Sequence, residues 1–311
     1  MNIDDIQHIV IVGAGTIGRQ VALQCAMHGY QVILYDILHQ ALQESQEQIK
    51  QFAQELTTDG QLTESEAAAA LARISTTADP AAAAEGADLL IESVLEQPGL
   101  KGQVLGQFNE FCPSQTIFTT NSSSLVPSQF AAATGRPDRF CAFHFHQPVW
   151  IANVVDIMPH PGTAAETVSL LHDFARCIDQ IPIYIKREHP SYVFNNMLDA
   201  ILSSAVELAA EDVASIEDID RAWMGVTKMP IGPFGILDLV GIDLAYEIVT
   251  QKIGWRSVFP RAKRITNLLK EKVDQGHLGV KSGAGFFTYP EPAFEQPEFL
   301  GISPAVENVD G

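Results

Sequence analysis

A glycine-rich turn between two regular elements constrains the fold of this chain more than any other feature. Residues 8–12 form an apolar, β-branched run, the letters GAGTIG follow at once, and residues 19–28 continue as an amphipathic stretch. A second apolar run at 31–35 ends at Asp36, 18 residues after Gly18. Strand, turn, helix and strand within about 30 residues predict a βαβ unit of a parallel sheet.

The positions of this turn have mechanical roles in holding a dinucleotide. Gly13 permits the tight turn, Gly15 lets the backbone approach a pyrophosphate, and Gly18 lets the helix pack on the strand. The helix N-terminus adds the positive end of its dipole. Asp36 would accept hydrogen bonds from the ribose hydroxyls and repel a 2′-phosphate, so NAD is expected rather than NADP. The predicted cofactor turn comprises Gly13, Ala14, Gly15, Thr16, Ile17 and Gly18.

The rest of the chain divides into a part with strands and a part without them. Short buried-strand candidates recur at 89–93, 116–119, 140–145, 154–158 and 181–186. A helical hairpin, broken at Gly60, is expected to be inserted at about 37–85. We therefore predict an α/β fold with a Rossmann-type, doubly wound parallel sheet in residues 1–187. A smaller all-α domain in residues 188–311 follows it.

Composition excludes several classes of partner. The formal net charge is −19 and the 19 Lys and Arg residues are scattered, so no nucleic acid is expected. The four cysteines lack CxxC spacing, which favours reduced thiols and no metal site. No apolar run approaches the roughly 18 residues of a membrane span, and the N-terminus lacks signal-peptide features. We expect a cytoplasmic protein with no membrane partner.

Two histidines are candidates for proton transfer. The segment RFCAFHFH places His144 and His146 two residues apart on a predicted strand, so that both side chains point to the same face. A histidine beside a dinucleotide site suits the oxidation of an alcohol, which must lose a proton as well as a hydride. The spacing alone does not choose between the two.

Five separated segments resemble the short-chain L-3-hydroxyacyl-CoA dehydrogenase family, in particular its 3-hydroxybutyryl-CoA dehydrogenase-like members. The resemblance covers nearly the whole chain, and the GPFGILDLVG pattern is highly specific. The segments are GAGTIG at 13–18, NSSSL at 121–125, RFCAFHFHQPV at 139–149, MPIGPFGILDLVGID at 229–243 and KSGAGFF at 281–287.

This resemblance implies roles for individual residues. His144 matches the family's base, which takes the hydroxyl proton, and Asp156 stands where a glutamate orients that base. Ser123 and Asn195 match residues that hold the substrate oxygens. Further cofactor contacts are implied for Glu96, Lys101, Asn121, Ser123, Gln147 and Lys281.

The chain departs from the family at several of these places. Asp156 is one methylene shorter than glutamate, which reduces the reach of its carboxylate by about 1.5 Å. His146 replaces a phenylalanine, Gln147 an asparagine, and Ser191 a glycine at the entry to the second domain. Residues 37–85, where the family offers basic side chains to CoA phosphates, contain only Lys50 and Arg73 against eight acids.

Three functions are therefore weighed. The first is NAD-dependent oxidation of an L-3-hydroxyacyl-CoA to the 3-ketoacyl-CoA, or the reverse, as in fatty acid metabolism. The second is dehydrogenation of a small free 3-hydroxy acid, as in related gulonate and carnitine dehydrogenases. The third is a non-catalytic NAD-binding protein, as in crystallin relatives. The resemblance also implies a homodimer through the helical domain, whose expected apolar face comprises Leu198, Ile201, Leu202, Ala205 and Leu208.

Overall fold

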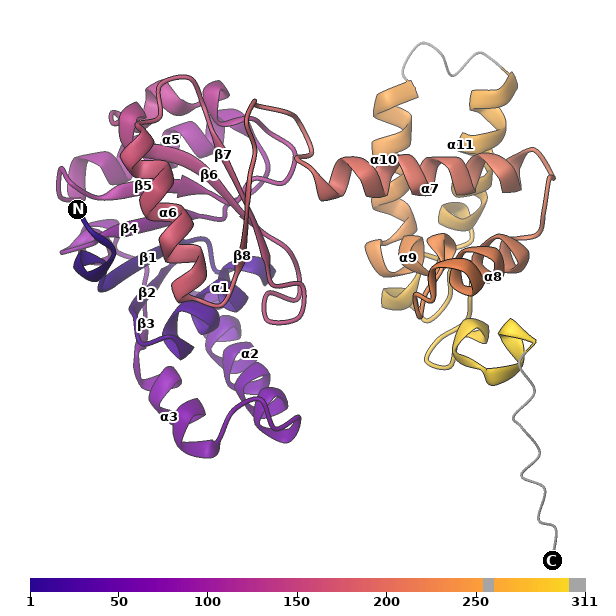
Figure 1. Cartoon of the computed structure of the whole chain (residues 1–311), viewed down its shortest axis with the longest axis horizontal. Coiled ribbons are helices and arrows are strands. Elements are labelled where there is room, and N and C mark those ends of the chain that lie inside the picture. The colour runs from indigo at the N-terminus through magenta and orange to yellow at the C-terminus, as the bar shows by residue number, and fades with distance from the viewer. Residues whose placement is uncertain (254–259, 302–311) are drawn as a thin grey trace, which may run out of the picture. The chain divides into compact units, whose positions relative to one another are not determined.

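The computed structural model describes residues 1–253 and 260–301. The chain forms two compact units, Met1–Asn196 and Met197–Gly311 (Figure 1). In the part of the chain that the structure describes, no helix is long and apolar enough to cross a membrane.

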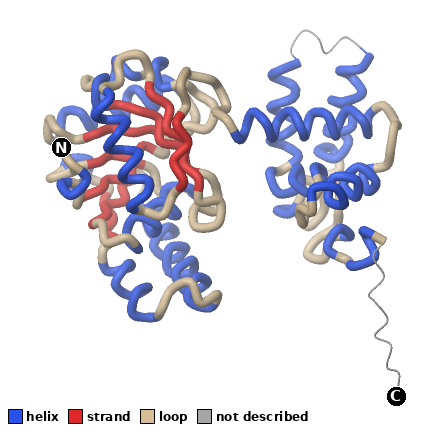
Figure 2. Tube along the Cα trace, in the orientation of Figure 1, coloured by secondary structure: helices blue, strands red, loops and turns tan. Residues whose placement is uncertain are grey.

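An eight-stranded sheet forms the centre of the first unit, and its strand order is β3-β2-β1-β4-β5-β6-β7-β8 (Figure 2). All neighbouring strands are parallel except β6 and β7. Only residues 146–153 join these two strands, which is too short for the crossover that a parallel pair needs. The strands are β1 (His8–Val12), β2 (Gln31–Tyr35), β3 (Ile74–Thr77), β4 (Leu89–Glu92), β5 (Ile117–Thr120), β6 (Phe140–Phe145), β7 (Val154–Pro159) and β8 (Ile181–Tyr184).

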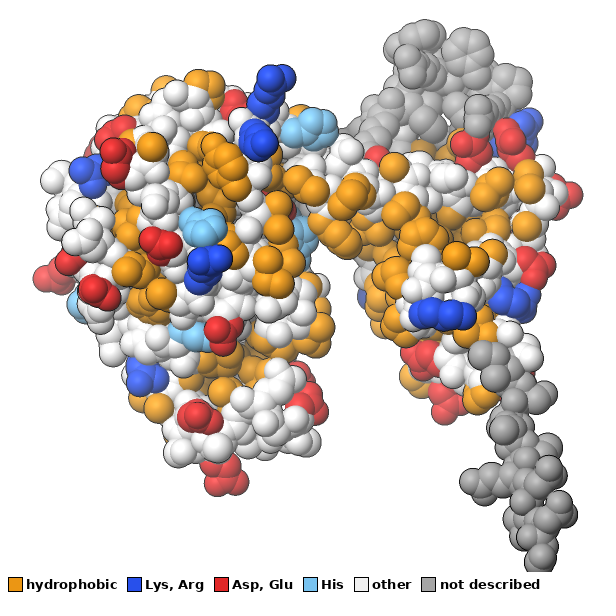
Figure 3. Space-filling model, in the orientation of Figure 1, with side chains coloured by type: hydrophobic (Ala, Val, Ile, Leu, Met, Phe, Trp, Pro, Cys, Tyr) orange, Lys and Arg blue, Asp and Glu red, His pale blue; other side chains and the backbone are white. Residues whose placement is uncertain are grey.

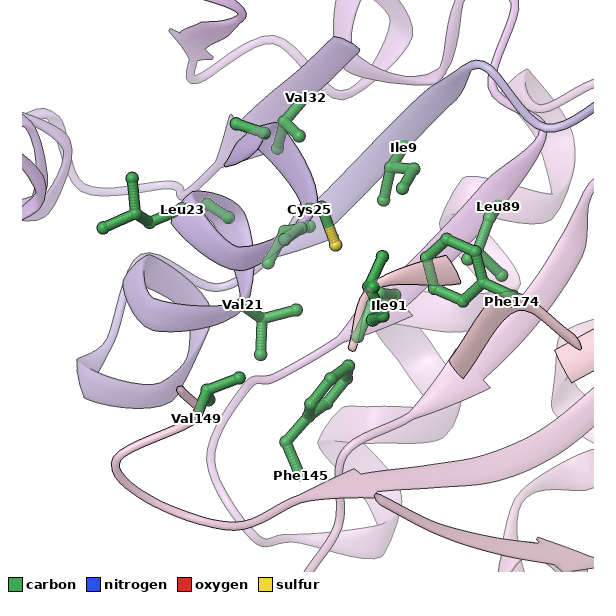
Figure 4. Close-up of a cluster of buried hydrophobic side chains, with 14 of the residues drawn as sticks. Ile9, Val21, Leu23, Cys25, Val32, Leu89, Ile91, Phe145, Val149 and Phe174 are labelled. Atoms are coloured by element: carbon green, nitrogen blue, oxygen red, sulfur yellow. The ribbon is translucent and has the colours of Figure 1, made fainter. Parts of the chain in front are cut away.

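Helices cover both faces of this sheet, which confirms the predicted doubly wound fold. Against one face, α1 and α6 pack with the hairpin into a buried cluster that includes Val21, Ile91 and Phe174 (Figure 4). On the other face, α4 and α5 contribute Ala83 and Phe108 to a second cluster. The helices are α1 (Thr16–Met27), α2 (His39–Thr58), α3 (Glu64–Ala72), α4 (Pro80–Ala84), α5 (Pro98–Phe111) and α6 (Ala165–Cys177).

The segment predicted as a purely helical insertion contains a strand. Helices α2 and α3 form the expected hairpin, and Gly60 in the connection has a left-handed backbone (φ 71°). The chain then forms β3, which pairs with β2 at the edge of the sheet. This strand has only four residues, ISTT, and three of them are polar, so it lacks the apolar run that marks the buried strands.

The second unit is a helical bundle among the residues described. Its core includes Phe234, Leu237, Ile242 and Leu269, and two isolated bridges near Ala284 are its only extended pairings there. Its helices are α7 (Phe194–Ala210), which begins at the end of the first unit, α8 (Ile216–Thr227), α9 (Pro233–Val240), α10 (Ile242–Ile253) and α11 (Pro260–Asp274).

Two buried aspartates explain why the motifs of this unit are so specific. Asp220 accepts hydrogen bonds from the backbone N–H groups of Phe234 and Gly235 and so caps α9. A side chain at Gly232 would collide with Asp220. Asp238 likewise accepts from the N–H groups of residues 286 and 287. The GPF and GFF patterns therefore serve the fold. Burial raises the pKa of Asp220 to about 6, against the effect of these hydrogen bonds.

Candidate active site

The glycine turn lies at the carboxyl ends of the parallel strands, between the neighbours β1 and β4. The chain continues from β1 to β2 on one side and from β4 to β5 on the other side. Ligands of such folds bind at the point where these two directions diverge. Gly13 has a left-handed backbone (φ 112°), and a Cβ there would lie 2.7 Å from the carbonyl oxygen of Ser93. A Cβ on Gly18 would collide with the carbonyl oxygen of Gly13. Both glycines are therefore required by close packing.

The space beside this turn suits a dinucleotide. Gly15 precedes the N-terminus of α1, and a Cβ there would meet no atom within 4 Å. Asp36, at the end of β2, accepts hydrogen bonds from the N–H groups of Ala14 (2.9 Å) and Leu38 (3.0 Å), one on each carboxylate oxygen. Each oxygen keeps a further lone pair. An open helix N-terminus next to a fixed carboxylate fits a pyrophosphate and a ribose.

His144 and Asp156 form a buried hydrogen-bonded pair. They lie directly opposite each other in the antiparallel register of β6 and β7. Nδ1 of His144 is 3.1 Å from Oδ2 of Asp156, and the two residues are 5% and 1% exposed. Among the described residues, none forms a hydrogen bond with Nε2 of His144. The shorter aspartate thus reaches the histidine because the strands place it directly across.

His146 shares the same carboxylate oxygen. Its Nε2 lies 3.0 Å from Oδ2 of Asp156, and its ring meets that of His144 edge-on, with 4.7 Å between centroids. One ring nitrogen of each histidine and one carboxylate oxygen of Asp156 lie within 4.8 Å of one another. Both of these nitrogens point at the carboxylate and form hydrogen bonds with it. The arrangement is therefore suited to holding protons.

The surroundings set the protonation of this pair. Burial lowers the pKa of His144, and the hydrogen bond to Asp156 offsets this effect only in part. Burial would raise the pKa of Asp156, but hydrogen bonds from His144 and His146 outweigh it and hold this pKa below its ordinary value. A neutral histidine beside an ionised carboxylate results at neutral pH. Its Nδ1 carries the proton, and Nε2 keeps a free lone pair.

Glu96 shapes the turn that presents Ser123. Its Oε1 accepts hydrogen bonds from the hydroxyl of Ser122 (2.5 Å), the N–H of Ser123 (3.0 Å) and the N–H of Ser124 (2.8 Å). Burial would raise the pKa of Glu96, yet the Ser122 hydroxyl and Lys101 hold it below its ordinary value. The Ser123 side chain is exposed, with no hydrogen-bond partner among the described residues. Its hydroxyl is available to a ligand.

Lys101 and Asn121 both serve the framework in this structure. Lys101 is 1% exposed, and its ammonium contacts Glu92 (2.8 Å), the carbonyl of Val94 (3.1 Å) and Glu96 (3.3 Å). These contacts occupy its three donors. The amide oxygen of Asn121 accepts a hydrogen bond from the backbone N–H of residue 145 (2.8 Å) and joins the ends of β5 and β6. Their predicted cofactor contacts stay predictions.

The remaining predicted site residues lie in three places. Gln147 is exposed after β6, where its side chain contacts Gln20 (3.4 Å). Asn195 follows Phe194, whose ring packs edge-on against that of His146 at 5.4 Å. Lys281 belongs to the second unit, where it forms an ion pair with Asp243 (2.6 Å). Sequence reasoning named His146 beside His144 as a candidate for proton transfer and noted that it replaces a phenylalanine, but it did not predict a contact with Asp156. Its shared contact with Asp156 depends on the register of β7.

Comparison with known families agrees with this geometry. Residues 8–188 match the NAD-binding domain of 3-hydroxyacyl-CoA dehydrogenase, and residues 192–289 match its C-terminal domain. The chain belongs to the 3-hydroxyacyl-CoA dehydrogenase family. It is accordingly an NAD-dependent oxidoreductase of the 3-hydroxyacyl-CoA dehydrogenase type, which confirms the predicted family, enzyme class and cofactor.

Relatives within this 3-hydroxyacyl-CoA dehydrogenase family differ in what they act on. The mitochondrial hydroxyacyl-coenzyme A dehydrogenase of Rattus norvegicus is 32% identical over 91% of each chain. A solved diketoreductase, described as acting on dicarbonyl compounds, is 36% identical with a TM-score of 0.83, covering 91% of this chain and 99% of its own. A 5-formyl-3-hydroxy-2-methylpyridine 4-carboxylate 5-dehydrogenase of Mesorhizobium japonicum is 29% identical over 91% of each chain. Membership thus leaves the substrate open.

Proposed function

We propose that the protein interconverts an L-3-hydroxyacyl-CoA and the 3-ketoacyl-CoA, with His144 as the group that takes and returns the proton. The observation that carries this proposal is the buried His144–Asp156 pair, which directs Nδ1 to the carboxylate and leaves Nε2 free. A carbinol O–H bond breaks during oxidation, and its proton passes to Nε2 of His144. Bound NAD would accept the hydride that leaves the carbinol carbon.

Asp156 is proposed to act through His144. Its charge stabilises the imidazolium that forms as the proton arrives, and its hydrogen bond fixes the tautomer beforehand. Ser123 and Asn195 are proposed to hold the oxygens of the substrate. In support, the Ser123 hydroxyl is exposed on a turn fixed by Glu96, and Asn195 follows a residue in contact with His146.

The cofactor is proposed to bind along the glycine turn and Asp36. By family resemblance, we propose further cofactor contacts from Glu96, Lys101, Asn121, Ser123, Gln147 and Lys281. The best supported of these is Ser123, since its hydroxyl has no other partner among the described residues. Lys101 would have to exchange one of its three present contacts for the cofactor.

Asp36→Ala should raise the KM for NAD about tenfold or more, because a hydrogen bond to a charged group contributes about 1.5–3 kcal/mol. The same change should narrow the preference for NAD over NADP, since the charge that repels a 2′-phosphate is removed. Initial rates with each cofactor measure both effects. Asp59→Ala, at the exposed end of α2, is the control. An unchanged cofactor ratio in Asp36→Ala would contradict this role.

A free 3-hydroxy acid without CoA is the second candidate substrate. The hairpin of α2 and α3 supports it, because its basic residues are few. Lys50 is exposed, but the guanidinium of Arg73 donates a hydrogen bond to the carbonyl of Ala26 (3.3 Å). A single free lysine among eight acids offers CoA phosphates little attraction. The similarity to the diketoreductase and to the pyridine carboxylate dehydrogenase points the same way.

The deciding experiment compares NADH oxidation with acetoacetyl-CoA and NAD reduction with a panel of free 3-hydroxy acids. We expect turnover of the thioester, lost in His144→Ala. Turnover of a free acid alone, still dependent on His144, would reject the CoA substrate and leave the chemistry intact. No turnover of either class would reject the proposed function.

We also propose that residues 1–187 bind the cofactor and that residues 188–311 form the contact between the two subunits of a homodimer. The second unit has a groove of about 680 Å³ between α7 and α8, lined by apolar residues such as Ile201 and Trp223, and Figure 3 shows apolar side chains gathered on this unit. A monomeric mass in sedimentation equilibrium would contradict the dimer.

The four free cysteines suit a cytoplasmic protein. Subcellular fractionation tests this proposed location.

A further inference from the structure

Two histidines, one on β6 and one directly after it, converge on a single carboxylate oxygen. Oδ2 of Asp156 lies 3.1 Å from Nδ1 of His144 and 3.0 Å from Nε2 of His146, while its Oδ1 is buried without a partner among the described residues. Only one of these contacts is needed to orient a base. The second one therefore needs its own explanation.

Strand geometry accounts for the convergence. Side chains two residues apart in an extended chain share a face, and His146 directly follows β6, two residues after His144. His144 is paired with Asp156 across to β7. His146 is the diagonal neighbour of Asp156, within reach of a long side chain. The ring of His146 thus reaches the same oxygen that His144 contacts.

We propose that His146 is a positioning residue that holds Asp156 and takes a share of its negative charge, so that His144 remains a neutral base. This inference rests on the proposed function of His144. A donor on Oδ2 stabilises the carboxylate and weakens its attraction for the His144 imidazolium. His146 also fixes the orientation of the carboxylate, because two hydrogen bonds restrict its rotation more than one.

The other groups around His144 define the balance that His146 changes. Burial and His146, which directly follows β6, lower the pKa of His144, whereas Asp156 on β7 and Glu96 after β4 raise it. Tyr192 stacks on the His144 ring at 4.9 Å, and burial raises its pKa well above the ordinary value, so it stays uncharged. Of these neighbouring groups, His146 is the one that both lowers the pKa of His144 and contacts Asp156.

Packing alone does not require a histidine at this position. The ring of His146 meets Phe194 edge-on, with 5.4 Å between centroids and planes at 88°, a contact that a phenylalanine ring makes equally well. The feature that a phenylalanine lacks is the hydrogen bond to Asp156. His146→Phe therefore removes the donor and keeps the shape, and His146→Gln keeps a donor on a flexible side chain.

The test is an NMR titration of the His144 ring in the cofactor-free full chain, assigned by its loss in His144→Ala. We expect the midpoint to rise by about half a pH unit or more in His146→Phe. It should stay near the wild-type value in His146→Gln and in His172→Phe, which alters a partly exposed histidine on α6. His146→Leu takes the place of His146→Phe should that variant not fold. An unchanged or lowered midpoint in the apolar variant overturns the inference.

Kinetics supply the matching functional readout. In His146→Phe, the pH profile of kcat/KM for oxidation should move upward by the same amount, a loss of about threefold at pH values below the midpoint. A fall in kcat/KM at every pH with no movement of the profile would indicate a merely structural role and overturn the inference. The titration needs no substrate. Absence of turnover in all proteins would therefore contradict the proposed function, while the titration still decides the effect of His146.

Discussion

His144→Ala should lower kcat in both directions by about 10²- to 10⁴-fold, the usual contribution of a positioned acid–base group. The imidazole of His144 is the one group of the buried pair with a nitrogen free to accept a proton, and alanine has no such group. Steady-state rates at saturating NADH and ketoacyl substrate measure the loss.

The fold and the cofactor site should survive this change. Asp156 keeps its hydrogen bond with His146, so the buried carboxylate is not left alone. The glycine turn belongs to β1 and α1, away from β6 in sequence. NADH binding, followed by fluorescence, should therefore match the wild type, and His172→Ala should be fully active. Wild-type turnover in His144→Ala would show that another group moves the proton.

Asp156→Asn should reduce kcat by about 10²- to 10⁴-fold, an effect comparable to loss of the base itself. The substitution preserves the shape of the side chain but removes the charge that stabilises the His144 imidazolium. An amide that turns its NH₂ group toward Nδ1 also selects the tautomer with the proton on Nε2, which cannot accept another. Turnover measured beside circular dichroism separates this effect from unfolding.

Asp156→Glu provides the matched control, because it retains the carboxylate and adds one methylene. We expect it to keep activity within about tenfold of the wild type, since a glutamate can still reach Nδ1 across the pair of strands. Full activity in Asp156→Asn would contradict the role of the charge. Equal losses in the asparagine and glutamate variants would show that a carboxylate restores activity only at the position that the shorter side chain gives it.

The sequence predicted the sheet well wherever a strand is buried on both faces. The runs at β1, β2, β4 and β6 are apolar and bounded by turn residues, which is the pattern of a central parallel strand. Strand β3 was missed because an edge strand of four residues needs little apolar surface. The antiparallel pairing of β6 and β7 follows from a short loop, and the prediction of a parallel sheet did not consider loop length.

The candidate site shows a similar division. The resemblance placed a histidine and a carboxylate twelve residues apart, and the structure brings His144 and Asp156 to hydrogen-bond distance. Asp156 is shorter than the glutamate of the family, but the register sets residue 156 directly opposite residue 144. The buried ion pairs of Lys101 and the shared contact of His146 depend on the backbone positions of several strands. One-dimensional spacing does not contain that information.

The geometry of the His144–Asp156 pair does not support the third candidate function, a protein that binds NAD without catalysis. A chain released from catalysis would not need a buried carboxylate, which costs free energy unless it is paired. Here Asp156 is 1% exposed, and its Oδ2 forms hydrogen bonds with both His144 and His146. This arrangement favours an active dehydrogenase.

The pH dependence of kcat/KM in the two directions tests the central claim most directly. Oxidation requires neutral His144, so log kcat/KM should rise with a slope of about one and become flat above the pKa of His144. Burial lowers this pKa below the ordinary value of 6.5, so oxidation should persist into mildly acidic solution. Reduction requires protonated His144 and should fall about tenfold for each pH unit above the same pKa. Opposite slopes that share one pKa, and vanish in His144→Ala, are the predicted result. Profiles that are flat in both directions between about pH 5 and 8, or that remain unchanged in His144→Ala, would contradict it.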